Sequence, residues 1–77
     1  MRERFFTVID SLEDEMDYEP ISAASQTIGM GYRYIFEAIA IPHDPVLEPY
    51  VAVVTFCWYI DDEWELEDIR KINKTLP

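Results

Sequence analysis

Few residues in this 77-residue chain could do covalent chemistry. His43 is the one histidine, and it stands beside Asp44 in a proline-rich stretch, where it could in principle act as a general base. Cys57 is the one cysteine, and it lies in an apolar run with no neighbouring cation to lower its pKa. We therefore expect His43 to be an exposed loop residue and Cys57 to be an unreactive core thiol. The sequence does not predict an enzyme.

Carboxylates are abundant, but their spacing does not match an ion- or phosphate-binding loop. The stretches EDEMDYE and DDEWELED lack the alternating ligands and the turn glycine of an EF-hand loop. Glu13 with Asp17, and Asp61 with Glu65, would each share a helix face, but two monodentate carboxylates make a weak cation site. The G-M-G sequence has no phosphate-binding helix after it. The sequence predicts no metal site and no cofactor.

Composition predicts a single small folded domain over residues 1–77 with a basic partner. Apolar residues make up 49% of the chain and aromatic residues 14%, which is too much for a disordered acidic segment. Sixteen acids against six bases give a net charge of −10. That charge opposes direct binding to nucleic acid or to an anionic membrane, and it favours a basic protein. The alternative interpretation is that the charge serves solubility alone.

Three features predict a cytoplasmic location. One cysteine excludes an internal disulfide, which fits a reducing compartment. No apolar run reaches the length of a transmembrane helix, and the start MRERFF lacks the apolar region of a signal peptide.

The apolar spacing predicts an α+β fold that begins with a helix. In residues 3–16, Phe5, Ile9, Leu12 and Met16 form one helical stripe. Pro20 then disfavours helix at the residue before it. Residues 21–31 are ambiguous. They predict either a short second helix, capped by Ser22 and stopped by Gly29 or Gly31, or an irregular connection.

The middle of the chain predicts a long antiparallel β-hairpin. Residues 32–41 alternate between two faces, and so do residues 50–60, with three prolines in the loop between them. Neither face of the second run is polar, so we expect that strand to be covered on both sides. Because a two-stranded sheet is marginal in water, we also expect a homodimer that extends the sheet.

The last segment, residues 61–77, predicts a C-terminal helix. Leu66, Ile69, Ile72 and Leu76 fall near one stripe, and Asp61 or Asp62 could cap the helix, with Glu65 at capping-box distance from Asp62.

Twelve of the 16 acids lie in two blocks, residues 10–19 and residues 61–68. A helix dipole favours acids at the N-terminus and disfavours them at the C-terminus. The second block therefore has a structural explanation as a helix start, and we treat it as a secondary acidic surface. Its members are Asp61, Asp62, Glu63 and Glu65.

The first block would crowd the wrong end of the predicted first helix, at a cost of about 1–3 kcal/mol. An arrangement that the fold does not favour is the better candidate for function. The alternative is an exposed, salt-screened edge with almost no cost. The predicted partner contacts are Glu13, Asp14, Glu15, Asp17 and Glu19, with Tyr18 as an aromatic anchor. If the two blocks were adjacent in space, they would form one negative face.

These observations lead to two functional hypotheses. In the first, the chain is an inhibitor or adaptor that occupies a basic surface of another protein. Its sharpest form is a phage-type anti-defence inhibitor whose carboxylates mimic nucleic acid and whose target is a nucleic-acid-binding protein. In the second, the chain is a small dimeric chaperone or structural subunit that binds through its apolar sheet, using Tyr32, Tyr34, Trp58 and Tyr59. Salt should weaken the first kind of binding and change the second little.

Overall fold

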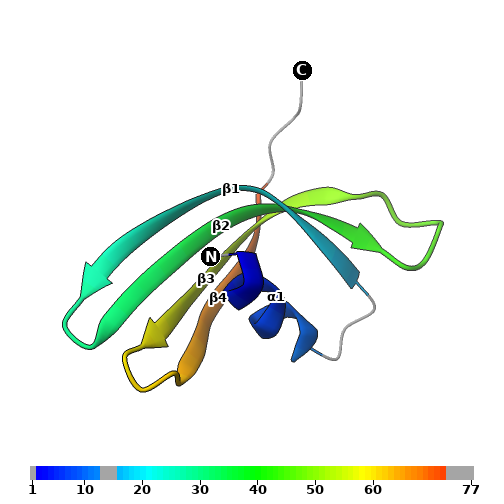
Figure 1. The fold of residues 1–77 in the computed structure, drawn as a ribbon. Helices are drawn as coiled ribbons and strands as arrows, with labels where there is room; N and C mark the ends of the chain where they lie inside the picture. Colours follow the sequence, from blue (N-terminus) through cyan, green and yellow to red (C-terminus); the bar gives the residue numbers. More distant parts are fainter. Residues whose placement is uncertain (1, 13–15, 73–77) are drawn as a thin grey trace.

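The computed structural model describes residues 2–12 and 16–72, which form one helix and a four-stranded antiparallel sheet. The strands follow one another in the order β1-β2-β3-β4. In Figure 1 the helix lies within the concave side of the curved sheet. The elements are α1 (Arg2–Asp10), β1 (Met16–Ile28), β2 (Gly31–Pro42), β3 (Tyr50–Tyr59) and β4 (Trp64–Ile72).

Helix α1 is held on the sheet by the apolar residues Phe5, Val8 and Ile9, which are buried. Val8 and Ile9 are three and four residues after Phe5, which places all three on the same helix face. The helix ends at Asp10. After it, the Ser11 backbone N–H and side-chain hydroxyl both donate to the carbonyl of Val8, three residues earlier. The prediction of a helix as far as residue 16 was therefore too long. Leu12 and Met16 still pack against the core, but from outside the helix.

The core lies between α1 and the concave side of the sheet. Phe5 packs on Phe36 with the ring centroids 4.5 Å apart, and Phe36 stacks on Phe56 at 5.8 Å. Three fully buried alanines leave room for the helix and for these rings. They are Ala38, Ala40 and Ala52.

The predicted hairpin is confirmed as β2 and β3. These strands pair antiparallel, with Ala38 opposite Ala52 and Phe36 opposite Val54. The proline-rich segment between them is a loop, as predicted. Its turn is fixed by Asp44, whose carbonyl accepts from Leu47 N–H and whose carboxylate accepts from Val46 N–H.

The predicted structure of residues 21–31 was wrong in both of its forms. Residues 21–28 continue β1, which pairs with β2 along its length and has a β-bulge at Ile21, between Pro20 and Ser22. The short segment Gly29-Met30 then joins β1 to β2. Pairing with the edge of β2 satisfies the backbone groups of a stretch that has no helical apolar stripe of its own.

The predicted C-terminal helix is also wrong, because residues 64–72 are strand β4. Leu66 and Ile69 are three residues apart, which resembles a helical spacing. They share the concave side because the register shifts at this point: Thr55 pairs with Asp68 and Phe56 with Leu66. The extra residue between them is a β-bulge, which changes the spacing of one face from two to three. Ile72 lies on the opposite side, since it pairs with Val51.

The expectation that β3 is covered on both sides is not met. Helix α1 covers the concave side, and no helix or strand of residues 2–12 and 16–72 covers the convex side (Figure 1). β3 lies between β2 and β4, so both of its edges are paired. With four strands and a packed helix, the sheet does not need a second copy for its own stability, which removes the predicted reason for a dimer.

Candidate functional site

The first acidic block does not present its predicted contacts on one surface. Asp17 and Glu19 are exposed, and the Asp17 carboxylate lies 3.1 Å from His43 Nε2. His43 is an exposed loop residue, as predicted. Tyr18 points the other way and is buried in the core at 8% exposure, so it cannot anchor a partner without leaving the core. The three remaining predicted contacts, Glu13, Asp14 and Glu15, lie outside the described residues.

Asp61, Asp62 and Glu63 of the second acidic block lie in the turn between β3 and β4. Tyr59 N–H donates to the Glu63 carbonyl at 2.8 Å, and Asp62 N–H donates to the Tyr59 carbonyl at 3.0 Å. Asp62 has a φ of 63°. Such a three-residue hairpin loop requires a left-handed residue at this point, and Asp tolerates that conformation better than most residues. Asp61 closes the turn by accepting from Glu63 N–H.

These bounds remove the dipole argument that ranked the two blocks. The second block is not at a helix start, and α1 ends at Asp10, before most of the first block. The structural role of Asp61 and Asp62 in the second block is therefore turn formation. Glu65 follows the turn on β4, where its carboxylate accepts from the Tyr59 hydroxyl at 3.2 Å.

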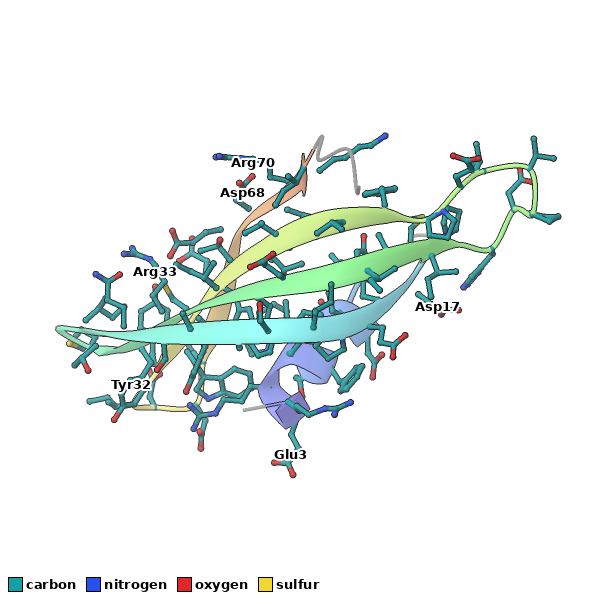
Figure 2. The ribbon with its side chains drawn as sticks, turned by 90° about the horizontal axis from the view of Figure 1, so that it is seen from above. Glu3, Asp17, Tyr32, Arg33, Asp68 and Arg70 are labelled. Atoms are coloured by element: carbon teal, nitrogen blue, oxygen red, sulfur yellow. The ribbon has the colours of Figure 1, made fainter. Side chains whose placement is uncertain are left out.

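Asp17 of the first block and the turn residues of the second block lie at opposite ends of the sheet. Asp17 pairs with Ile41 near the end of β2, whereas the β3–β4 turn lies beside Gly31 at its start. The intervening 12 residues of β2 span about 40 Å when extended. Figure 2 shows the same separation, with Asp17 at one end of the sheet and Tyr32 at the other. Among the described residues, Asp17 and the acids of the β3–β4 turn do not form one continuous negative face.

The aromatic residues of the second hypothesis also fail to form one surface. Tyr34 is buried, and Tyr59 lies on the side of the sheet opposite to Trp58. On the concave side, the Arg4 guanidinium lies 5.1 Å from the Trp58 ring centroid and donates to the Tyr34 hydroxyl at 2.6 Å. Arg4 thus holds the start of α1 on the sheet through cation–π contacts and one hydrogen bond.

The convex side of the sheet is a large uncovered apolar surface. We call it the convex face, and it consists of the strand side chains that point away from α1. Its Ile35 and Ile41 are 39% and 37% exposed, although both have neighbours on adjacent strands. Ile39 lies opposite Val51, which in turn lies opposite Ile72. The branched apolar residues of the convex face are Ile35, Ile39, Ile41, Val51, Val53 and Ile72.

The convex face is hollowed at the β-bulge of β1. A hollow of about 360 Å³ is lined there by Ile21, Ile39, Pro49, Tyr50 and Val51. Ile21 is 56% exposed beside it. An apolar hollow beside exposed branched side chains is the kind of surface that proteins use to seat a partner's side chain.

Carboxylates surround and interrupt this apolar surface. Cross-strand pairing puts six acids and two bases on the convex face, a net charge of −4. Both bases are already paired, Arg33 with Glu67 at 2.9 Å and Arg70 with Asp68 at 3.5 Å. Figure 2 shows Arg70 beside Asp68 on the β4 side of the sheet. The six acids are Asp17, Glu19, Glu37, Glu65, Glu67 and Asp68.

Cys57, Glu67 and Arg33 form a polar cluster at one end of the convex face. Cys57 is 3% exposed, and its thiol donates to Glu67 Oε1 at 2.6 Å. Burial, the hydrogen bond and the negative charge of Glu67 together raise the pKa of the Cys57 thiol. The hydrogen bonds from Cys57 and Arg33 hold the pKa of Glu67 below its ordinary value. The thiol therefore stays protonated, as expected for an unreactive cysteine, although the sequence did not reveal Arg33 or Glu67 as its neighbours.

This cluster predicts an alkaline loss of stability. The folded protein holds the Cys57 proton more tightly than the unfolded chain does, so the neutral thiol stabilises the fold fully below its ordinary pKa of 9.0. That stabilisation is lost as the pH rises through and above this value. We expect urea titrations to show Cys57→Ala losing less stability above pH 9 than wild type, by up to about 1.4 kcal/mol per pH unit. Equal slopes in the two proteins would contradict the placement of the thiol.

The described part of the chain shows neither a metal-binding cluster nor a membrane-spanning helix. Residues 2–12 and 16–72 contain no group of three or more His, Cys, Asp or Glu side chains that could hold a metal ion. Over the same ranges, α1 is the one helix, and its nine residues are too few to cross a membrane. No protein-family model, no curated protein and no solved structure matches this chain.

Proposed function

We propose that this chain is a small binding protein, an inhibitor or adaptor, that binds a basic amphipathic segment of another protein through the convex face. One observation carries the proposal: the convex face presents the exposed Ile35 and Ile41, with half-buried Ile and Val side chains beside them, among six carboxylates and with no described element over it. Burying these side chains against a partner would supply affinity. The negative charge would select a basic partner and speed its approach.

The fold of the sheet suggests what such a partner looks like. Helix α1 already covers the concave side with a stripe of apolar residues. A sheet with helices on both faces is a common layered arrangement, so a second amphipathic helix is a natural ligand for the convex face. Its apolar stripe would meet Ile39 and Val51, and its Lys or Arg residues would meet Glu37 and the carboxylates at the rim.

This proposal changes the predicted contacts while keeping the predicted partner class. Asp17, Glu19 and Glu65 remain contacts, because they lie on the convex face. A nucleic-acid mimic would be a special case of the same class. It would use the carboxylates alone, whereas the convex face offers apolar groups between them.

The second hypothesis, a chaperone or structural subunit, is favoured by the apolar convex face itself. Salt separates the two. Under our proposal, affinity for a basic ligand falls steeply as salt is raised. Salt shortens the range of the attraction between exposed charges to about 10 Å at 0.1 M. A chaperone that binds through apolar contact would instead hold acidic and basic ligands equally at every salt concentration.

The test uses a synthetic amphipathic helical peptide with leucine on one face and lysine on the other. We expect fluorescence anisotropy to detect binding, and Ile35→Arg to weaken it by at least about tenfold, because it puts a repelling charge on the convex face. Ile60→Arg is the matched control, because Ile60 is 77% exposed in the β3–β4 turn, away from the apolar surface. Equal effects of the two variants, or equal binding of a leucine–glutamate peptide, would overturn the proposal.

A further inference from the structure

The two edge strands of the sheet differ in how they are protected. Edge strands expose unpaired backbone groups, and soluble proteins usually block them with charges, prolines or bulges. β4 follows this rule, since five of the nine residues in WELEDIRKI are charged. β1 has a β-bulge at Ile21, but the residues after it, 22–27 with the sequence SAASQT, have no charge, no proline and no further bulge.

This part of β1 is also exposed to solvent, because α1 does not pack against it. Tyr18 is buried and Pro20 half-buried at the start of the strand, where α1 lies beneath it. From the β-bulge onward every residue of the segment 21–27 is exposed. Figure 1 shows this half of β1 running beyond α1 toward the turn that joins it to β2. One side of the segment is paired with β2, and its other side is the outer edge of the sheet.

We propose that residues 21–27 pair with the same residues of a second copy, antiparallel across a two-fold axis, so that two four-stranded sheets join into one. Pairing about Ala24 puts Ser22 opposite Gln26 and Ala23 opposite Ser25. No like charges meet, although each chain carries a net charge of −10. Such pairing makes the same patch of both copies complementary to itself, as a two-fold interface requires.

The other surfaces are less suited to a second copy. Each β4 strand carries three acids and two bases, so pairing of β4 with β4 would have to withdraw ten charged side chains from water and match every acid with a base. Stacking of two convex faces would oppose two surfaces that each carry a net charge of −4. The uncharged edge of β1 is the surface where two copies approach with the least repulsion. The pairing leaves both convex faces free, so it does not depend on the proposed function.

Sedimentation velocity tests the pairing. We expect a wild-type species of twice the 9.1 kDa of one chain. Ala24→Glu should weaken dimerisation by at least about tenfold, because two carboxylates would then face each other across the axis. Ala24→Lys should do the same. A mixture of the two variants should recover the dimer as a heterodimer, since opposite charges would meet at the axis.

The controls separate pairing from general effects of charge and folding. Ile60→Glu adds the same charge at an exposed position off the edge, and it should leave the dimer intact. Circular dichroism and urea titration should show both Ala24 variants folded, because residue 24 is exposed. A monomeric wild type, dimers that persist in both Ala24 variants, or a mixture that stays monomeric would each overturn the pairing. Peptide binding is tested with Ile35→Arg and Ile60→Arg, which leave residues 21–27 unchanged, and dimerisation is tested without peptide, so failure here is distinct from failure of the proposed function.

Discussion

Replacing Gly31 by alanine is expected to destabilise the protein by about 2–4 kcal/mol, through overpacking and backbone strain together. A Cβ at this position would lie 2.2 Å from the Trp58 carbonyl oxygen and 2.8 Å from the Tyr59 Cα. Both are backbone atoms of β3, so neither can rotate away as the end of a side chain would. The φ of Gly31 is 155°, which L-residues rarely adopt.

The chain provides a matched control two residues earlier. A Cβ on Gly29 would have nothing within 4 Å, and its φ is not positive. Gly29→Ala should therefore leave stability within about 1 kcal/mol of wild type, or raise it slightly by restricting the unfolded chain. Urea titration of both variants measures the difference. Equal stabilities for Gly29→Ala and Gly31→Ala would show that β2 does not approach β3 closely at this point.

The same site explains why the effect should reach beyond one hairpin. Ile60 N–H in the β3–β4 turn donates to the Met30 carbonyl in the β1–β2 turn at 2.9 Å. Moving β2 away from Trp58 and Tyr59 would break this link between the two turns. Faster hydrogen exchange at Ile60 in Gly31→Ala, and not in Gly29→Ala, is the expected signature.

The central hairpin was predictable because its information is local. β2 and β3 each alternate between two faces over their full lengths, and prolines mark the loop between them. β4 carries the same kind of information, but the bulge at Glu67 changes its period. A spacing of three between Leu66 and Ile69 is a helical signal in isolation and a strand signal only beside β3. Such a bulge depends on the partner strand, which the sequence of β4 does not show.

The second half of β1 was unpredictable for a different reason. In ISAASQT only Ile21 and Thr27, at its two ends, are residue types that favour strand, and no apolar period joins them. Its conformation is set by β2, whose edge supplies a hydrogen-bonding partner. The alanines and serines adopt a strand conformation because they pair with β2. This is a tertiary effect, and the composition of the segment does not predict it.

The candidate site was only partly accessible from the sequence. The apolar residues of the convex face were visible as the second face of each predicted strand, among them Ile35, Ile39 and Val53. Those of residues 50–60, such as Val53, were expected to be covered, because the number of layers in a fold is not a local property. The acids were visible as two blocks, but their separation follows from the antiparallel order of four strands. Sequence shows which groups exist, and the topology decides which of them share a surface.

Removal of the Phe5 ring should cost more than any other single change proposed for this protein. Phe5 is fully buried and packs on Phe36 at 4.5 Å. Truncating such a ring to alanine costs about 3–5 kcal/mol. A nine-residue helix is also too short to be stable in water by itself, so α1 depends on this contact. We expect Phe5→Ala to lose its helical circular dichroism and to expose the concave side of the sheet, which a dye for apolar surfaces would report.

Phe6 is the matched control, because it is the same residue type at the next position of the same helix. Its ring is half-buried and contacts Phe5 edge-on, with the Arg2 guanidinium 5.8 Å from its centroid. Phe6→Ala should cost about 1–2 kcal/mol, since less apolar surface is withdrawn from water there. Phe5→Leu, which keeps most of the volume, should restore the helix and most of the stability. If Phe5→Ala and Phe6→Ala were equally stable, α1 would not be docked through the face that carries Phe5, and the concave side would be as open to a partner as the convex face.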